Sequence, residues 1–238
     1  MNHLDLFSGI GGFSLAASWV WGDEHNIVSF CEIDPFCQKV LKKHWPGVPI
    51  QYDIKEYKHD GTNIDLLTGG PPCQATSVAA AIQGCRTNKT LYPEMDRIIR
   101  LVRPKWVIVE QPAGNKNWED SVKVSLESAG YTVDKFKRQV SDIGGYHGRR
   151  RVFFVANATC KRLKQVARFG RSSKAKAVAW PVPPRGAWRS TRTGNCGMDD
   201  GIPDWVDRLK SLGNAIVPQC VQPIMQAIKD INENIVAS

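Results

Sequence analysis

The sequence lacks the features that define several classes of protein. None of its apolar runs approaches the ~18 residues that cross a bilayer. The first residues, MNHLDLF, have neither the basic start nor the long apolar stretch of a signal peptide. The seven cysteines form no C-x-x-C pair, so neither a zinc ribbon nor a disulfide framework is indicated. We therefore expect a reduced, cytoplasmic protein with no membrane partner and no metal.

Acidic residues are absent between Asp142 and Asp199. This interval holds 13 of the 32 Lys and Arg residues, so the rest of the chain sums to −4 although the whole carries +9. A basic block beside a mildly acidic body favours a polyanionic partner, most often nucleic acid. Charge alone would equally allow a solvated basic loop. Phe169, Trp180 and Trp188 lie within the block and favour nucleic acid, because aromatic rings stack on bases.

What is present predicts a sizeable α/β domain. The chain has 238 residues, of which 42% are hydrophobic and 23% charged, as in ordinary globular proteins. Short β-rich runs alternate with segments whose apolar residues are spaced three and four apart. Strands are expected at residues 3–7, 27–31, 64–68, 106–109, 131–136 and 152–156, and helices at 13–21, 36–44, 93–102, 119–129, 205–212 and 219–235. This alternation predicts parallel β-α-β units in a doubly wound sheet, which binds ligands outside the carboxyl ends of its strands.

Three polar features follow the first expected strands. The stretch DLFSGIGGFSLA passes from strand to helix through a glycine-rich turn that matches neither G-x-G-x-x-G nor a phosphate loop. Glu32 follows the second strand, where an acid can bind a ribose diol, although it could also simply cap the helix that starts at Pro35. Asp53 ends the next strand and could accept a hydrogen bond from an adenine amine. Together they favour an adenosine-containing cofactor without a pyrophosphate cradle.

Cys73 and Glu110 follow the next two strands in the same row. Cys73 stands in GGPPCQ, where the thiol could be a packing residue, a metal ligand or a nucleophile on a rigid support. Glu110 ends the apolar run KWVIV, where an ionised carboxylate would be costly unless it is used or paired. A thiol beside a carboxyl group suggests covalent catalysis assisted by an acid.

In this order the motifs resemble those of C5-cytosine-specific DNA methyltransferases, most closely the compact type carried by phages. The resemblance covers residues 5–156 and 209–228 and rests on DLFSGIGGFSLA, CEIDPFC, GGPPCQ, VIVEQP, HGRRRVFFVA and LGNAIVPQ. It implies a Rossmann-like S-adenosylmethionine-dependent sheet with helices on both faces, plus a small basic target-recognition region. It also implies a monomer that acts on double-stranded DNA, in the host cytoplasm if phage-encoded. The implied segments are a catalytic and cofactor domain (1–156), a recognition region (157–192) and a C-terminal segment (193–238) that folds back beside the first strand.

The resemblance also implies a role for each matching residue. Cys73 would attack C6 of a flipped cytosine, Glu110 would support protonation at N3, and Arg149 and Arg151 would hold the base and a phosphate. The cofactor-binding residues would be Phe7, Gly9, Gly11, Glu32, Ile33, Asp53, Ile54, Pro72, Leu91, Asn214 and Ile216. The DNA-binding residues would be Ser77, Arg149, Arg150, Arg162, Lys164, Arg168, Arg171, Arg185 and Arg189.

The sequence departs from the family pattern at three places. Gln111 and Pro112 replace the usual Asn-Val, His147 replaces a glutamine, and PCQATS replaces the commoner PCQPFS. The usual asparagine helps to fix the nucleophile loop, so its replacement could reshape the pocket. Three alternatives remain open: a tRNA methyltransferase, a DNA-binding relative without activity, and an enzyme that transfers a group larger than methyl. The short recognition region predicts a short or degenerate target site and strongly salt-dependent binding.

Overall fold

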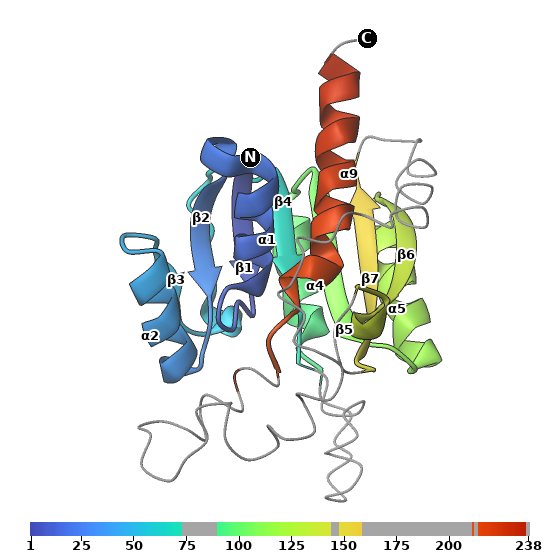
Figure 1. Cartoon of the computed structure of the whole chain (residues 1–238), viewed down its shortest axis with the longest axis horizontal. Helices are drawn as coiled ribbons and strands as arrows, with labels where there is room; N and C mark the ends of the chain where they lie inside the picture. Colours follow the sequence, from blue (N-terminus) through green and yellow to red (C-terminus); the bar gives the residue numbers. More distant parts are fainter. Residues whose placement is uncertain (73–89, 144–147, 159–210, 212–213, 237–238) are drawn as a thin grey trace, which may run out of the picture.

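A seven-stranded sheet organises the part of the chain that the computed structural model describes, namely residues 1–72, 90–143, 148–158, 211 and 214–236 (Figure 1). The strand order is β3-β2-β1-β4-β5-β7-β6. The strands are β1 (Asn2–Leu6), β2 (Asn26–Cys31), β3 (Ile50–Gln51), β4 (Leu66–Gly69), β5 (Trp106–Pro112), β6 (Thr132–Gln139) and β7 (Arg150–Asn157). Every strand expected from the apolar runs is therefore present, and most extend further than predicted.

The five strands from β3 to β5 are parallel, as the alternation of strands and helices predicted. That prediction is wrong for β7, which pairs antiparallel with both β5 and β6. The reason is the length of the connection. Parallel neighbours need a crossover of a dozen or more residues, whereas Gln139 and Arg150 are only eleven positions apart. The arrowheads of β2 and β4 in Figure 1 accordingly point opposite to that of β7.

The helices begin where local capping groups are available. The described helices are α1 (Gly12–Trp21), α2 (Pro35–His44), α4 (Tyr92–Val102), α5 (Lys116–Ser128) and α9 (Pro218–Val236). Asp34 caps α2, since its Oδ1 accepts from the N–H groups of Phe36 and Cys37 at 2.9 and 3.3 Å. Asn115 caps α5 in the same way, which explains why this helix starts before the expected Glu119.

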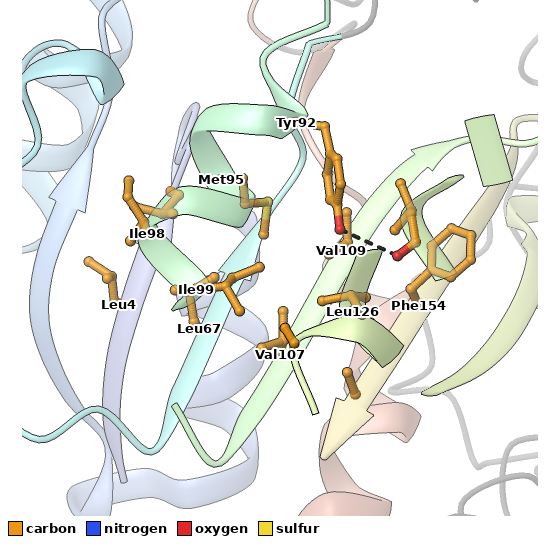
Figure 2. Packing of buried hydrophobic residues seen from close by; sticks show 14 of the residues in the cluster. Leu4, Leu67, Tyr92, Met95, Ile98, Ile99, Val107, Val109, Leu126 and Phe154 are labelled. Carbon is orange, nitrogen blue, oxygen red and sulfur yellow. Dashed lines mark hydrogen bonds between the residues drawn. The ribbon is translucent and has the colours of Figure 1, made fainter. Parts of the chain in front are cut away.

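Helices cover both faces of the sheet, as the resemblance implied. On one face, α4 and α5 place Met95, Ile98, Ile99 and Leu126 against strand residues that include Leu4, Leu67 and Val107 (Figure 2). Tyr92 closes this layer by donating its hydroxyl to the Val122 carbonyl at 3.4 Å, the dashed line in Figure 2. Each aliphatic side chain buried here contributes about 1.5–3 kcal/mol relative to an exposed one. The rigid sheet that results fixes where its strand ends lie.

The C-terminal helix α9 packs with α1 on the opposite face (Figure 1). Asn232 Oδ1 accepts from the Trp106 indole N–H at 3.2 Å, and Lys229 Nζ donates to the Val20 carbonyl at 3.2 Å. The chain end thus returns to the first β-α unit, where α9 packs beside α1. Within the described residues, no helix has both the length and the apolarity that crossing a membrane requires.

Candidate active site

The parallel strands bring the predicted polar residues to one edge of the sheet. The turn from Phe7 to Gly12 follows β1, Glu32 follows β2, Asp53 follows β3, Pro71 and Pro72 follow β4, and Glu110 lies near the end of β5. Adjacent parallel strands end side by side, so residues far apart in the sequence gather along this edge. Their hydrogen bonds divide the edge into a β1–β3 half and a β4–β5–β7 half.

The glycine turn in the β1–β3 half is tightly packed except at Gly9. A Cβ at Gly11 would lie 2.4 Å from the Trp45 ring, and one at Gly12 would lie 2.2 Å from Cγ2 of Ile216. Gly9 has a φ of 53° and no atom within 4 Å of its Cβ position. Phe7 also adopts the left-handed region, with a φ of 53°, which costs energy for a residue other than glycine. Because no atom lies near the Cβ position of Gly9, a ligand can approach the backbone closely there.

Glu32 is held beside this turn by backbone N–H groups. Its Oε2 accepts from Gly9 N–H at 2.6 Å and its Oε1 accepts from Asp34 N–H at 2.8 Å. Burial raises the pKa of the Glu32 carboxyl, while these two hydrogen bonds oppose the shift. A carboxylate can accept about four hydrogen bonds, so each oxygen keeps capacity for a further donor such as a ribose hydroxyl.

Residues around Asp53 continue the same edge. Asp53 Oδ1 accepts from Lys55 N–H at 2.9 Å and caps a short 3-10 helix in which Ile54 is buried. Glu32 N–H donates to the Gln51 carbonyl at 3.0 Å, which brings the two strand ends together. Ile33 directly follows Glu32 and Tyr52 directly follows Gln51, and their exposed fractions are 54% and 58%. Tyr52, directly before Asp53, was not singled out from the sequence.

A buried network of polar side chains links β1 to α1, to β4 and to His25. The Asp5 carboxylate accepts from the Ser14 hydroxyl at 2.7 Å and from the Thr68 hydroxyl at 3.0 Å. Thr68 Oγ1 is also 2.8 Å from Nε2 of His3, whose Nδ1 is 3.0 Å from Nε2 of His25. Burial raises the pKa of Asp5 to about 7, and burial lowers the pKa of His3 well below its usual value. This network was not predicted from the sequence.

Glu110 is the central group of the β4–β5–β7 half. Its Oε1 lies 2.6 Å from Nε of Arg151 on the neighbouring strand β7. Burial raises the pKa of the Glu110 carboxyl, and the positive charges of Arg151 and then Arg149 oppose that shift. Burial has the larger influence, so the neutral acid is favoured over a wider pH range than in an exposed glutamate.

The arginines connect this half to the returning C-terminal segment. Arg149 Nη2 donates to the Asn214 carbonyl at 3.4 Å, and burial together with Arg151 lowers the pKa of Arg149. Arg150 points elsewhere, since its Nε donates to Gln139 Oε1 at 2.9 Å on the exposed side of the strand pair. Arg149 and Arg151 thus both act on Glu110, whereas Arg150 does not contact it.

The loop after β4 lies directly against β5. A Cβ at Gly70 would lie 3.1 Å from Glu110 Oε2, so the loop passes close to the carboxyl group. The Pro71 carbonyl accepts a hydrogen bond from Nε2 of Gln111, and the Pro72 carbonyl accepts one from Leu91 N–H at 3.4 Å. Gln111 was treated as a departure from the family pattern, yet its side chain still contacts the loop that precedes Cys73.

Several predicted residues lie outside the described residues. They are Cys73, Ser77 and His147, together with the basic residues Arg162, Lys164, Arg168, Arg171, Arg185 and Arg189. The placement of the nucleophile and of most predicted DNA contacts therefore rests on the sequence. Within the ranges that the structure describes, no group of three or more His, Cys, Asp or Glu residues could hold a metal ion.

The fold is a Rossmann-like sheet whose strand ends gather Glu32, Asp53 and the buried acid Glu110. Comparison with known proteins identifies the family. The model for C-5 cytosine-specific DNA methylase matches residues 1–188, so the chain belongs to this family. Type II methyltransferase M2.BsuMI of Bacillus subtilis is 36% identical over 115 residues, covering 46% of this chain and 28% of that protein. M.HgiCII of Herpetosiphon aurantiacus is 31% identical over 166 residues, covering 65% and 36%.

Solved structures agree with this assignment. A protein from an E. coli prophage, assigned as a DNA modification methyltransferase, has a TM-score of 0.54 at 27% identity, covering 69% of this chain and 48% of that chain. The S. pombe Dnmt2 methyltransferase has a TM-score of 0.57 at 16% identity, which supports the fold alone; 77% of this chain and 57% of that chain are covered. This chain spans only 28% and 36% of the two curated relatives named above.

Proposed function

We propose that this protein is a DNA (cytosine-5-)-methyltransferase that uses S-adenosylmethionine and a covalent Cys73 adduct. The observation that carries the proposal is the Glu110 site. A buried carboxyl group with a raised pKa is paired with Arg151, and it lies against the Gly70–Pro71–Pro72 loop that leads into Cys73. The chain belongs to the C-5 cytosine-specific DNA methylase family by the match over residues 1–188. This membership supports cytosine methylation as the reaction that the Glu110 site performs.

The residues of the β1–β3 half suit the proposed cofactor. The open space beside Gly9 admits a nucleoside to the backbone, and Glu32 keeps acceptor capacity for a ribose diol. Asp53 with Ile33 would contact the adenine, and Phe7, Gly11, Ile54, Pro72, Leu91, Asn214 and Ile216 would complete the pocket. When bound, S-adenosylmethionine supplies an electrophilic methyl group.

The proposed reaction adds and then removes the thiolate. Cys73 sulfur forms a bond to C6 of the cytosine, and the ring electrons move toward N3, where Glu110 donates a proton. C5 becomes nucleophilic and accepts the methyl group. Loss of the C5 proton to a base and departure of the thiolate from C6 restore the double bond, and Glu110 recovers its proton. Arg151 and Arg149 stabilise the Glu110 carboxylate that exists between these proton transfers.

Access to C6 requires that the base leaves the duplex stack. We therefore include base flipping in the proposal, with Arg149, Arg151 and the basic block that follows Ala158 as phosphate-binding groups. Neutralising several phosphates makes binding strongly dependent on salt. A measured decrease of affinity with rising salt concentration would support this part of the proposal independently of catalysis.

The test compares the wild type with Cys73→Ser on duplex DNA of mixed sequence and labelled S-adenosylmethionine. 5-Methylcytosine, identified by nucleoside mass, is expected from the wild type alone, while Cys73→Ser should still bind DNA and cofactor. Cys85→Ser, a cysteine further along the same segment, is the matched control and should retain transfer. Intact cytosine in wild-type samples that bind both ligands would overturn the proposal. Methylation of tRNA instead of duplex DNA would show that the substrate is RNA. A product heavier than methylcytosine would indicate another donor.

A further inference from the structure

Five side chains form a row of hydrogen bonds from the buried Asp5 carboxyl group to the protein surface. Thr68 Oγ1 lies 3.0 Å from Asp5 Oδ1 and 2.8 Å from Nε2 of His3. Nδ1 of His3 lies 3.0 Å from Nε2 of His25, and Nδ1 of His25 lies 3.0 Å from Ser18 Oγ. Asp5, Thr68 and His3 are fully buried, whereas His25 and Ser18 are partly exposed. We call these five residues the Asp5 row.

Asp5 is the member of this row whose charge changes at about pH 7. Burial raises its pKa to about 7, and the charge of Glu32 acts in the same direction. Burial lowers the pKa of His3 well below its usual value and that of His25 to about 4, where the N-terminal ammonium adds to the shift. The acidic pair Asp23–Glu24, which precedes His25, is exposed. Both imidazoles are therefore neutral, and a neutral imidazole has one N–H donor and one acceptor nitrogen.

An ionised Asp5 sets the direction of every hydrogen bond in the Asp5 row. The carboxylate can only accept, so the Thr68 hydroxyl donates to it. His3 then donates from Nε2 to Thr68 and accepts at Nδ1. His25 consequently donates from Nε2 to His3 and accepts at Nδ1 from the Ser18 hydroxyl. In this arrangement each donor points toward Asp5.

A protonated Asp5 allows the opposite direction. Its Oδ1–H donates to Thr68, whose hydroxyl then donates to Nε2 of His3. His3 donates from Nδ1 to His25, and His25 donates from Nδ1 to Ser18. In this arrangement each donor points away from Asp5, and both histidines have changed tautomer.

Ser14 makes both arrangements possible without an unpaired hydroxyl group. The Ser18 hydroxyl donates either to His25 or to the Ser14 carbonyl, which is 2.9 Å away. Asp5 Oδ2 accepts from the Ser14 hydroxyl at 2.7 Å, so Oδ1 is the oxygen that faces the row. An unpaired buried polar group costs about 1–3 kcal/mol, and neither arrangement leaves one in the row.

We propose that the Asp5 row is a proton relay, which connects Asp5 to solvent and reverses the tautomers of both histidines when Asp5 ionises. The Asp5 proton passes to Thr68 Oγ1, while Thr68 gives its own proton to Nε2 of His3. The Nδ1 proton of His3 passes to Nε2 of His25, and the Nδ1 proton of His25 leaves to water beside Ser18. One proton is released and one negative charge remains on Asp5. The relay thus lets a carboxyl group inside the core follow the external pH without local unfolding.

The first experiment observes the tautomers in the full-length protein. Isotope-labelled histidine is followed by long-range proton–nitrogen NMR between about pH 5 and pH 9, and each of the five histidines is assigned by the signal lost on its substitution. We expect His3 and His25 to carry their proton on Nδ1 at low pH and on Nε2 at high pH, with one shared midpoint at about pH 7. Rings that keep one tautomer, change separately or become imidazolium in this range would overturn the proposal.

Thr68→Val interrupts the Asp5 row and keeps the shape of the side chain. His3 then loses its link to Asp5, so neither ring should change tautomer at the midpoint of the Asp5 carboxyl carbon signal. Thr62→Val is the matched control, because the Thr62 hydroxyl bonds to the exposed Asp60 outside the row. This control should retain the shared midpoint. A tautomer change that still follows Asp5 in Thr68→Val would contradict the relay.

Asp5→Asn decides the same question if Thr68→Val does not fold. The amide oxygen can accept from the Ser14 hydroxyl as Oδ2 does, which turns the NH₂ group toward Thr68. The variant should therefore hold both histidines in their low-pH tautomer at every pH. A pH-dependent change of tautomer in Asp5→Asn would rule out Asp5 as the group that drives it.

The second experiment tests the route to solvent. His25→Phe keeps a ring in place and removes both nitrogens, so a proton from Asp5 has no acceptor beyond His3. Near the midpoint, the protonated and ionised forms of Asp5 should then exchange more slowly, and the carboxyl carbon signal should broaden or split relative to wild type. His44→Phe, at an exposed position of α2, is the control and should keep the wild-type signal. A wild-type signal in folded His25→Phe would mean that the proton leaves by another path.

Discussion

The two halves of the candidate site hold their carboxylates by different means. In the β1–β3 half, Glu32 and Asp53 accept hydrogen bonds from backbone N–H groups. In the β4–β5–β7 half, Glu110 is paired with the Arg151 side chain, and the adjacent loop is held by the Gln111 side chain. Backbone donors are fixed by the fold and suit the recognition of one ligand shape. The positive charges of Arg151 and Arg149 oppose the burial that raises the pKa of the Glu110 carboxyl, which suits a group that gives up and recovers a proton.

Removing the titratable carboxyl from the β4–β5–β7 half should have the largest effect. Glu110→Gln retains the shape of the side chain but cannot transfer a proton. We expect single-turnover methyl transfer to fall by about 10²- to 10⁴-fold, with the affinity for S-adenosylmethionine unchanged because Glu110 is not among the proposed cofactor-binding residues. Calorimetric titration measures the affinity, and thermal melting verifies that the variant is folded.

Glu127→Gln is the control for this substitution. Glu127 forms a surface pair with Lys123 at 3.7 Å near the C-terminal end of α5, and neither residue is among the proposed site residues. Its rate of transfer should match that of the wild type. A Glu110→Gln rate within about three-fold of the wild type would show that the carboxyl group performs no proton transfer, and the contrast between the two halves would no longer hold.

The next largest effect is expected beneath the β1 end, where Asp5 is buried. Its folded pKa of about 7 lies above the value of about 3.9 in an unfolded chain. A raised carboxyl pKa means that the folded state binds more protons, so this contribution to stability is lost as pH rises from about 4 to about 7. Asp5→Asn removes that dependence. The free energy of unfolding of the variant, relative to wild type, should increase across this range by up to about 4 kcal/mol.

Urea denaturation between about pH 4 and pH 7 measures this difference. Asp65→Asn is an informative control, because its pKa is shifted the other way. Burial would raise the pKa of Asp65, but hydrogen bonds from Lys105 and Asn2 N–H outweigh burial and lower it. Asp65 gains its stabilising effect as pH rises from its lowered folded pKa to the unfolded value of about 3.9, so between about pH 4 and pH 7 the Asp65→Asn variant should be less stable than wild type by a nearly constant amount. If the free energy of unfolding varied with pH in the same way for Asp5→Asn and wild type, Asp5 would not have a raised pKa in the folded protein.

These predictions depend on features that differ in how far the sequence reveals them. The strands and the row of residues after successive strands follow from local patterns, and the structure contains the strands and the members of the row other than Cys73, which lies outside the described residues. The Asp5–Thr68 and Gln111–Pro71 bonds join residues 63 and 40 positions apart, so no local pattern encodes them. The antiparallel direction of β7 was missed because the length of its connection was not weighed against the alternation of elements. These two bonds and the direction of β7 depend on how distant segments pack in the folded chain.

A smaller effect is expected from Glu32→Gln in the backbone-held half. Both Glu32 oxygens accept N–H groups, from Gly9 and from Asp34, and an amide can accept only one of them. The other backbone N–H would face an NH₂ group, which should displace the glycine turn. Losing a hydrogen bond to a charged group costs about 1.5–3 kcal/mol, so calorimetry should show S-adenosylmethionine binding weakened about 10- to 100-fold.

Asp53→Asn tests whether the expected loss of affinity in Glu32→Gln comes from its two backbone hydrogen bonds. Among the described residues, Asp53 accepts one backbone bond, at Oδ1 from Lys55 N–H at 2.9 Å, and the oxygen of an asparagine can keep it. The affinity for S-adenosylmethionine should therefore decrease less than in Glu32→Gln, by about five-fold at most. Equal losses in the two variants would mean that negative charge, rather than the geometry of the backbone donors, governs binding in this half. The distinction between a backbone-held and a side-chain-held carboxylate would then concern catalysis alone.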